Sequence, residues 1–314
     1  MPSADKGLYV AYAPGADFVK FQLVYARELA SPVYQYFSLF QGLEMTDADW
    51  QTVADEARAG GIGLVVDVFG HESLALAGRL GAAAVKIHVT DFFNDPLIDR
   101  ALQTVPEVFF SAGGMTPDDI AAFLSRRPAG AVDRMTLLYG FQAEPTATAD
   151  NRLGRLTSIR ARFPGLKVGF LDHADGASDE GGWLGAVAVG LGASMIEKHI
   201  TLDRRLQMED YVSALAPEPF AAYVARIRAA EVAVGTADLS LSEAEQAYRR
   251  RAVKIVVATR AMARGHRVGE GDVALLRTAV VPGQPTLERF GDAHGRSVAR
   301  DIAAWAAVSP EDLS

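Results

Sequence analysis

Seven short apolar segments, each followed by a stretch with the pattern of a helix, constrain the fold of this chain more than any other feature. Most of them begin roughly 20 to 33 residues apart, a spacing typical of parallel βα units. No glycine-rich dinucleotide fingerprint accompanies them, which favours an α/β fold of the (β/α)8 TIM-barrel type over a doubly wound sheet. The expected strands cover residues 18–22, 64–69, 84–89, 107–113, 134–141, 167–173 and 194–200.

The eighth strand that such a barrel requires is degenerate or missing. The stretch LYVAY at residues 8–12 is the only candidate for it, at the start of the barrel. An open barrel edge leaves backbone N–H and C=O groups unpaired. We therefore expect residues 1–14 either to be poorly ordered or to form an irregular strand-like patch between the strands at 18–22 and 194–200.

A change of composition after the last barrel segment predicts a second domain. A long amphipathic helix and a polar connector are followed by short valine-rich stretches and turns. We expect a barrel domain over residues 1–236, a linker over 237–251 and a small β-rich domain over 252–314. A faint repeat at an offset of 40 residues, which aligns Arg260 with Arg300, indicates pseudo-symmetry in that domain; chance similarity in an Ala/Val/Arg-rich chain is the alternative.

The composition excludes several classes of protein. The chain has no cysteine, so it has no disulfide, no thiolate nucleophile and no Cys-ligated zinc. Its net charge of −8 argues against nucleic acid as a partner. No apolar run approaches the roughly 20 residues that span a bilayer, and the first residues lack the pattern of a signal peptide. We therefore expect a cytoplasmic protein that does not bind membranes.

Polar side chains mark the carboxyl ends of the expected strands, where barrel enzymes place their sites. Residues i and i+2 of a strand share a face, which pairs Lys20 with Gln22 and Lys86 with His88. Only six of the 31 basic residues are lysine, so a lysine within an apolar strand indicates a function such as holding an anion. The alternative is a structural lysine whose aliphatic stem is buried while its ammonium group reaches solvent.

Two histidines end successive strands. His173 and His199 carry imidazoles that suit a divalent metal, and Asp172 and Glu197 are nearby candidates for orienting the rings. Two core histidines bonded to the backbone are the alternative. Ser111 lies in a Ser-Ala-Gly-Gly loop before a capped helix, a place where backbone N–H groups favour an oxyanion or phosphate.

Several of these motifs together resemble the N-acetylneuraminate (sialic acid) synthases and their bacterial nonulosonic acid relatives. The motifs are GADFVKFQ, AVKIH, FFSAGGM, VGFLDH, and IEKHITLD followed by MEDYVSALAPEPF. The tail, from VVATRAMARGHRVGEGD to FGDAHGRSVARDI, resembles their C-terminal antifreeze-like (SAF) domain. The resemblance implies a TIM barrel plus a SAF domain in a domain-swapped homodimer.

The resemblance also implies a reaction. The family condenses phosphoenolpyruvate with an N-acylated aldose, such as N-acetylmannosamine, to give a nine-carbon α-keto acid and phosphate. It uses a divalent metal, for which Mn²⁺ or Mg²⁺ is expected here. Arg277, in VALLRTAV, matches the SAF-domain arginine that reaches the sugar bound in the partner subunit.

The motifs carry over residue by residue. Lys20 and Lys86 match the lysines that bind phosphoenolpyruvate, and with Glu197, an active-site glutamate, they form the expected catalytic set. His173 and His199 match the metal-binding histidines. The expected substrate-binding residues are Gln22, Thr90, Asp91, Ser111, Gln142, Asp210 and Arg277.

The chain also departs from the family pattern. Val89 and Leu171 stand where the family usually has serines, which removes hydroxyl contacts to phosphate, and Glu144 replaces a tyrosine. The family's first-strand Glu and its Asn-His pair have no counterpart; either the start of the chain is truncated or mis-set, or LYVAY at residues 8–12 substitutes as a degenerate strand. As an enzyme, the chain is therefore expected to turn over below the order of 1 s⁻¹. The second hypothesis is a catalytically weakened paralogue that binds a sugar phosphate or modulates an intact synthase; an unrelated aldolase-type barrel is the third.

Overall fold

The computed structural model describes residues 15–280 and 283–314. The strand-like patch expected at residues 1–14 lies outside the described residues. The described chain divides into two compact units, with the boundary between Gly235 and Thr236.

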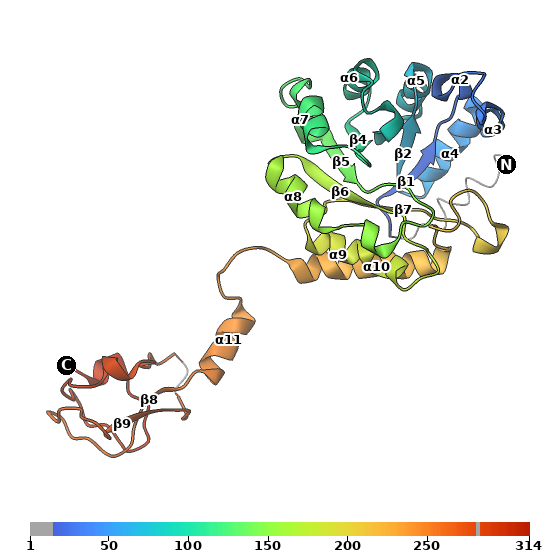
Figure 1. The fold of residues 1–314 in the computed structure, drawn as a ribbon. Coiled ribbons are helices and arrows are strands. Elements are labelled where there is room, and N and C mark those ends of the chain that lie inside the picture. Colours follow the sequence, from blue (N-terminus) through green and yellow to red (C-terminus); the bar gives the residue numbers. More distant parts are fainter. Residues whose placement is uncertain (1–14, 281–282) are drawn as a thin grey trace. The chain divides into compact units, whose positions relative to one another are not determined.

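The first unit is built on a curled, wholly parallel sheet of seven strands in the order of the sequence (Figure 1). All seven expected strands are confirmed, and they differ from the expected ranges only at their ends. The strands are β1 (Phe18–Gln22), β2 (Gly63–Val68), β3 (Ala84–Ile87), β4 (Glu107–Ser111), β5 (Met135–Tyr139), β6 (Lys167–Asp172) and β7 (Ile196–Lys198).

Successive side chains along each strand point to opposite faces of the sheet, so the apolar side chains form two separate clusters. Residues such as Val66, Phe110 and Phe170 point outward and join the large core between the sheet and the helices. Their neighbours in the chain point inward and pack against one another across the interior of the curled sheet. This inner cluster consists of Val65, Ala84, Phe109, Leu138 and Leu171, with Met195 against it.

Helices follow the strands and cover the outer face of the sheet (Figure 1). Several begin at side-chain caps; Thr116, for example, accepts a hydrogen bond from the Asp119 N–H while Asp119 accepts one from Thr116, as its sequence indicates. The helices of this unit are α2 (Ala26–Leu29), α3 (Phe37–Gly42), α4 (Asp47–Ala59), α5 (His71–Leu80), α6 (Asp95–Thr104), α7 (Pro117–Ser125), α8 (Gly154–Arg162), α9 (Leu184–Gly190) and α10 (Pro217–Val234).

The sheet does not close within the described residues, because β1 and β7 are its two edges. A cavity of about 430 Å³ is lined by both edge strands and by residues of α10. Over the part of the chain that the structure describes, the expected TIM barrel is therefore a TIM-like sheet of seven strands.

The second unit contains α11 (Glu243–Ala252) and one antiparallel pair, β8 (Ile255–Ala258) with β9 (Val273–Leu276). Ser242 caps α11, so part of the expected linker is helical. Among the helices described in the two units, none is long and apolar enough to cross a bilayer.

The 40-residue repeat in the second unit is a structural repeat. Arg260 binds Asp272 with an N–O distance of 2.7 Å between Nε and Oδ1, and Arg300 binds Asp312 in the same way at 2.5 Å. The backbone bridges follow the same symmetry, and they pair Val257 with Ala307, Arg267 with Ser297 and Met262 with Ile302. The repeat therefore reflects two interlocked copies of one motif rather than chance.

Candidate active site

Three charged side chains predicted from the sequence meet inside the curled sheet, at the carboxyl ends of its strands. Lys86 Nζ donates to Glu197 Oε1 at 2.7 Å, and Lys20 Nζ lies 3.6 Å from the same oxygen. Lys86 is 3% exposed, and only 17–19% of the Lys20 and Glu197 side chains is exposed. The prediction that the two strand-end lysines face one site agrees with this arrangement.

A fourth charged residue, which the sequence analysis missed, completes the cluster. Asp67 near the end of β2 is fully buried, and its Oδ2 accepts a hydrogen bond from Lys20 Nζ at 2.7 Å. In the strand register, its Cα lies between those of Gln22 on β1 and Lys86 on β3. The signal was a single acid within the apolar run LVVDVF.

Opposite charges keep these groups ionised despite burial. Burial would lower the pKa of Lys20, but Asp67 and Glu197 outweigh it and raise the pKa above its usual value. Burial would raise the pKa of Glu197, but Lys20 and Lys86 outweigh it and hold that pKa well below its usual range. At neutral pH both groups are therefore charged, and Glu197 is an acceptor rather than an acid.

The two histidines predicted as metal ligands lie side by side. The ring centroids of His173 and His199 are 5.1 Å apart, a separation that suits two ligands each about 2 Å from one ion. Burial lowers the pKa of His173 to about 4, and burial together with His173 lowers the pKa of His199 to about 3. Both imidazoles are therefore neutral at pH 7, the form that binds metals.

The donor set fits a divalent ion with two protein nitrogens. The Nδ1 atom of His173 is buried and makes no hydrogen bond with the described residues, as expected for a nitrogen reserved for a ligand. Asp210 Oδ2 lies 3.5 Å from His199 Nδ1. No group of three His, Asp or Glu side chains among the described residues is arranged to hold a metal, so oxygen ligands from solvent or substrate would complete the shell.

Two acidic residues and a glutamine form a polar cluster beside the histidines. Gln142 Nε2 donates to Asp210 Oδ1 at 3.0 Å and to Glu144 Oε1 at 2.8 Å. Burial, followed by a hydrogen bond with Glu144, raises the pKa of Asp210 to about 7, whereas accepting that bond lowers the pKa of Glu144. Of the two hydrogen-bonded carboxyl groups, Asp210 is therefore the one that takes up a proton first as the pH falls.

The loop that carries Asp210 is held to the site by many hydrogen bonds. Asp210 has a left-handed backbone, with φ of 60°, and Ser213 Oγ donates to the His173 carbonyl at 2.9 Å. Gly176 packs so closely that a Cβ there would lie 2.1 Å from the Ala214 oxygen. The Arg204 guanidinium donates to the backbone oxygens of residues 211, 212 and 214 at 2.6–2.9 Å.

A buried network lies behind the histidines. Asp172 does not orient the imidazoles, which corrects the expectation from the sequence: because side chains alternate along β6, it points to the outer face while Leu171 points inward. There it accepts hydrogen bonds from Lys198 Nζ at 3.1 Å and from the Tyr223 hydroxyl at 2.7 Å. The network ties β6, β7 and α10 together immediately beside the two histidines.

The other predicted site residues stand at or near the strand ends. Gln22 is exposed at the end of β1, and Ser111 is buried at the end of β4. Thr90 and Asp91 follow β3, where Thr90 Oγ1 donates to Asp91 at 3.1 Å. Arg277, in the second unit, is exposed and donates to the Ala252 carbonyl at 3.3 Å. Their roles as substrate contacts stay predictions.

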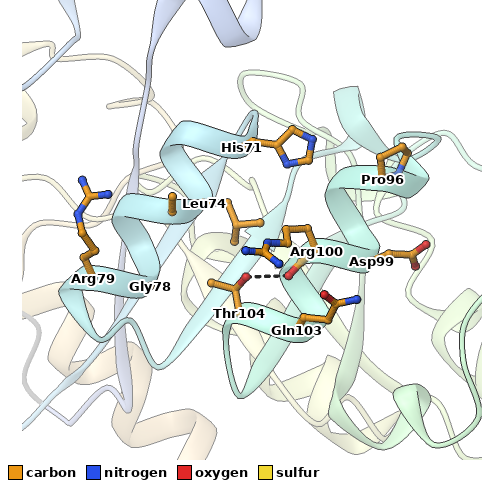
Figure 2. Close-up of a pocket in the computed structure, with 10 residues that line it drawn as sticks. His71, Leu74, Gly78, Arg79, Pro96, Asp99, Arg100, Gln103 and Thr104 are labelled. Carbon is orange, nitrogen blue, oxygen red and sulfur yellow. Dashed lines mark hydrogen bonds between the residues drawn. The ribbon is translucent and has the colours of Figure 1, made fainter.

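A larger groove, of about 900 Å³, lies elsewhere, between α5 and α6 (Figure 2). Figure 2 shows His71 and Pro96 at one end of the two helices and Thr104 at the other. None of the charged residues of the strand-end cluster lines this groove. The chemistry predicted from the sequence therefore belongs to the strand ends rather than to this groove.

Comparisons with known proteins agree with the resemblance. The sequence profile of the NeuB family matches residues 8–238. An N,N'-diacetyllegionaminic acid synthase from Legionella pneumophila is 25% identical over 301 residues, which cover 90% of this chain and 83% of that protein. A pseudaminic acid synthase from Helicobacter pylori is 25% identical over 296 residues, covering 87% and 83%.

Solved structures share the fold. A crystal structure of N-acetylneuraminic acid (sialic acid) synthetase from Leptospira borgpetersenii superposes with a TM-score of 0.71 at 22% identity, covering 80% of this chain and 87% of that one. The family match ends at residue 238, so the SAF assignment of the second unit stays a prediction.

Proposed function

The chain belongs to the NeuB family, and from that premise we propose that it is a nonulosonic acid synthase. In this proposal it condenses phosphoenolpyruvate with an N-acylated hexosamine, such as N-acetylmannosamine, and releases phosphate. The observation that carries the proposal is the meeting of Lys20, Lys86 and Glu197 beside two neutral imidazoles. A trianionic substrate and an aldehyde can then be held face to face, which makes the reaction effectively unimolecular.

The lysines bind phosphoenolpyruvate by exchanging partners. Without substrate their charges are matched by Asp67 and Glu197. A bound phosphate or carboxylate competes for the same ammonium donors, each of which has three N–H groups. Lys20 is the more accessible of the two, so we assign it the first contact with the incoming anion.

The acceptor sugar lies on the histidine side in this proposal. The open-chain aldose presents its aldehyde near His173 and His199, while Gln142 and Asp210 bind its hydroxyl groups. A divalent ion, when bound by the two imidazoles, supplies Lewis-acid polarisation of a carbonyl oxygen. Because Asp210 has a pKa of about 7, it can donate a proton to the oxygen of the former aldehyde.

The reaction balances with one water molecule. The methylene carbon of the enol forms a bond to the aldehyde carbon, whose oxygen takes up a proton. Water adds to the former enol carbon, phosphate leaves, and the α-keto acid remains. Arg277 completes the acceptor site from the partner subunit in the proposed domain-swapped homodimer.

Binding of phosphoenolpyruvate tests this proposal. Lys86→Met and Lys20→Met should each weaken binding by tenfold or more in calorimetry, because each removes a charge from the anion site. Lys167→Met is the matched control, since Lys167 is exposed near Glu107 at the other end of β6. Equal affinities in all four proteins would contradict the assignment.

A weakened paralogue that binds a sugar phosphate is the second candidate. It is favoured by Leu171, which is buried in the inner apolar cluster where the family usually offers a hydroxyl. Binding of phosphoenolpyruvate without any condensation product, under conditions in which metal and N-acylated hexosamines are saturating, would select this candidate.

A further inference from the structure

The proposed anion site contains as much negative charge as positive charge. Two lysines, Lys20 and Lys86, are joined to two carboxylates, Asp67 and Glu197, by N–O distances of 2.7 to 3.6 Å. Glu197 was expected from the sequence, but no motif assigned a role to Asp67. The extra carboxylate is unfavourable for binding a phosphate, so its presence requires a physical reason.

Asp67 does not contact a ligand directly, because it is 0% exposed. Its Oδ2 accepts from Lys20 Nζ at 2.7 Å. Its Oδ1 is buried and finds no hydrogen-bond donor among the described residues, an arrangement that costs stability. A buried carboxylate with one unsatisfied oxygen therefore persists, and among the described residues its side chain hydrogen-bonds only to Lys20, the substrate-facing lysine.

The geometry points to Asp67 as a positioning residue that acts through Lys20. We propose that Asp67 holds the Lys20 ammonium in the orientation needed for reaction and, by its charge, limits how tightly the site binds an anion. The proposal rests on the proposed function, since the anion is the phosphate or carboxylate of phosphoenolpyruvate.

The proposal predicts opposite effects on affinity and turnover. In Asp67→Asn the site carries one less negative charge, so inorganic phosphate and phosphoenolpyruvate should bind about tenfold more tightly, equivalent to about 1.4 kcal/mol. The asparagine holds an ammonium group less firmly than a carboxylate does, so kcat should fall about tenfold. In Asp67→Glu the charge stays and the geometry shifts, so kcat should fall while the affinity for phosphate stays within about twofold of the wild type.

The experiment is calorimetric titration of the full chain with inorganic phosphate and with phosphoenolpyruvate, together with condensation kinetics. Asp99→Asn is the matched control: it removes one carboxylate that binds Arg127 at 2.6 Å on the outer face of the unit. Its affinity for phosphate should equal that of the wild type. A general loss of stability would weaken binding and slow turnover together. It therefore cannot produce the predicted combination of tighter binding and a lower kcat.

The outcomes separate this inference from the proposed function. Tighter phosphate binding in Asp67→Asn supports the inference even when no variant forms a condensation product. Unchanged or weaker binding in that variant, or the same affinity change in Asp67→Glu, overturns it while leaving the lysine assignment intact. If Asp67→Asn does not fold, Lys20→Met/Asp67→Asn removes both charges of the pair together. Phosphate should then bind about tenfold more tightly to the double variant than to Lys20→Met, and binding as weak as that of Lys20→Met overturns the inference.

Discussion

Replacement of Tyr223 by phenylalanine isolates one hydrogen bond of the network behind the histidines. The Tyr223 side chain is 2% exposed, and its hydroxyl donates to Asp172 Oδ2 at 2.7 Å. Burial and Asp172 raise the pKa of Tyr223 well above its ordinary value, so the phenol remains protonated and acts as a donor. Phenylalanine keeps the ring and its packing but removes this donor.

The size of the expected stability loss follows from the burial and the charge of the acceptor, Asp172. Hydrogen bonds to charged groups contribute about 1.5–3 kcal/mol, and Asp172 is 0% exposed, so water cannot replace the lost donor. We expect Tyr223→Phe to lower the free energy of unfolding of the first unit by that amount. For a unit of this size, each kcal/mol corresponds to a fall of about 2–4 °C in Tm, which predicts a total of about 3–12 °C.

Urea unfolding, followed by the fluorescence of the buried Trp50, measures this loss in the first unit. Tyr25→Phe is the matched control, because the Tyr25 hydroxyl also donates to a carboxylate, Asp47, at 3.3 Å but in an exposed position. The control should change the free energy of unfolding by less than about 0.5 kcal/mol. Equal effects of the two substitutions would refute the argument that burial of Asp172 gives the bond its strength.

Three further predictions address the metal, the second unit and the partner subunit. His173→Ala should abolish Mn²⁺ binding in calorimetry, whereas His71→Ala, in the outer groove, should retain it; retention in both would exclude the histidine pair as the metal site. Hydrogen bonds led by that of His266 lower the pKa of Asp272, so this carboxylate stabilises the second unit above its unfolded pKa of about 3.9 and the contribution is lost as the pH falls below that value. Asp272→Asn should therefore lower the urea midpoint more at pH 7 than at pH 2, and an equal shift at both would contradict the linkage. Arg277→Ala should raise the KM for the sugar by tenfold or more with the dimer intact by light scattering, and an unchanged KM would remove Arg277 from the site.

The strands and the inward-facing charges were predictable because both depend on local rules. Apolar runs at βα spacing gave all seven strands, and the two-residue period placed Lys20, Lys86, His173 and His199 on the inner face. These predictions need only the position of a residue within its own strand. Any chain with the same spacing would be expected to form the same kind of sheet.

The features that were missed depend on register and on long-range contacts. The role of Asp67 follows from its register between β1 and β3, which no single strand reveals. Asp172 was expected beside the imidazoles, yet the alternation that turns His173 inward turns its neighbour outward, toward Tyr223 on α10. Gln142 contacts Asp210, 68 residues away, through a loop whose path depends on Arg204.

In the proposed function, the strand-end cluster and the histidine pair form one condensation site. The most direct test incubates the full chain with phosphoenolpyruvate, N-acetylmannosamine and Mn²⁺, and follows both phosphate release and the mass of the sugar product. We expect equal amounts of phosphate and nonulosonic acid, with slow turnover that is lost on removing the metal and in His173→Ala. Absence of any product from a panel of N-acylated hexosamines, in protein that binds phosphoenolpyruvate through Lys20 and Lys86, would contradict it.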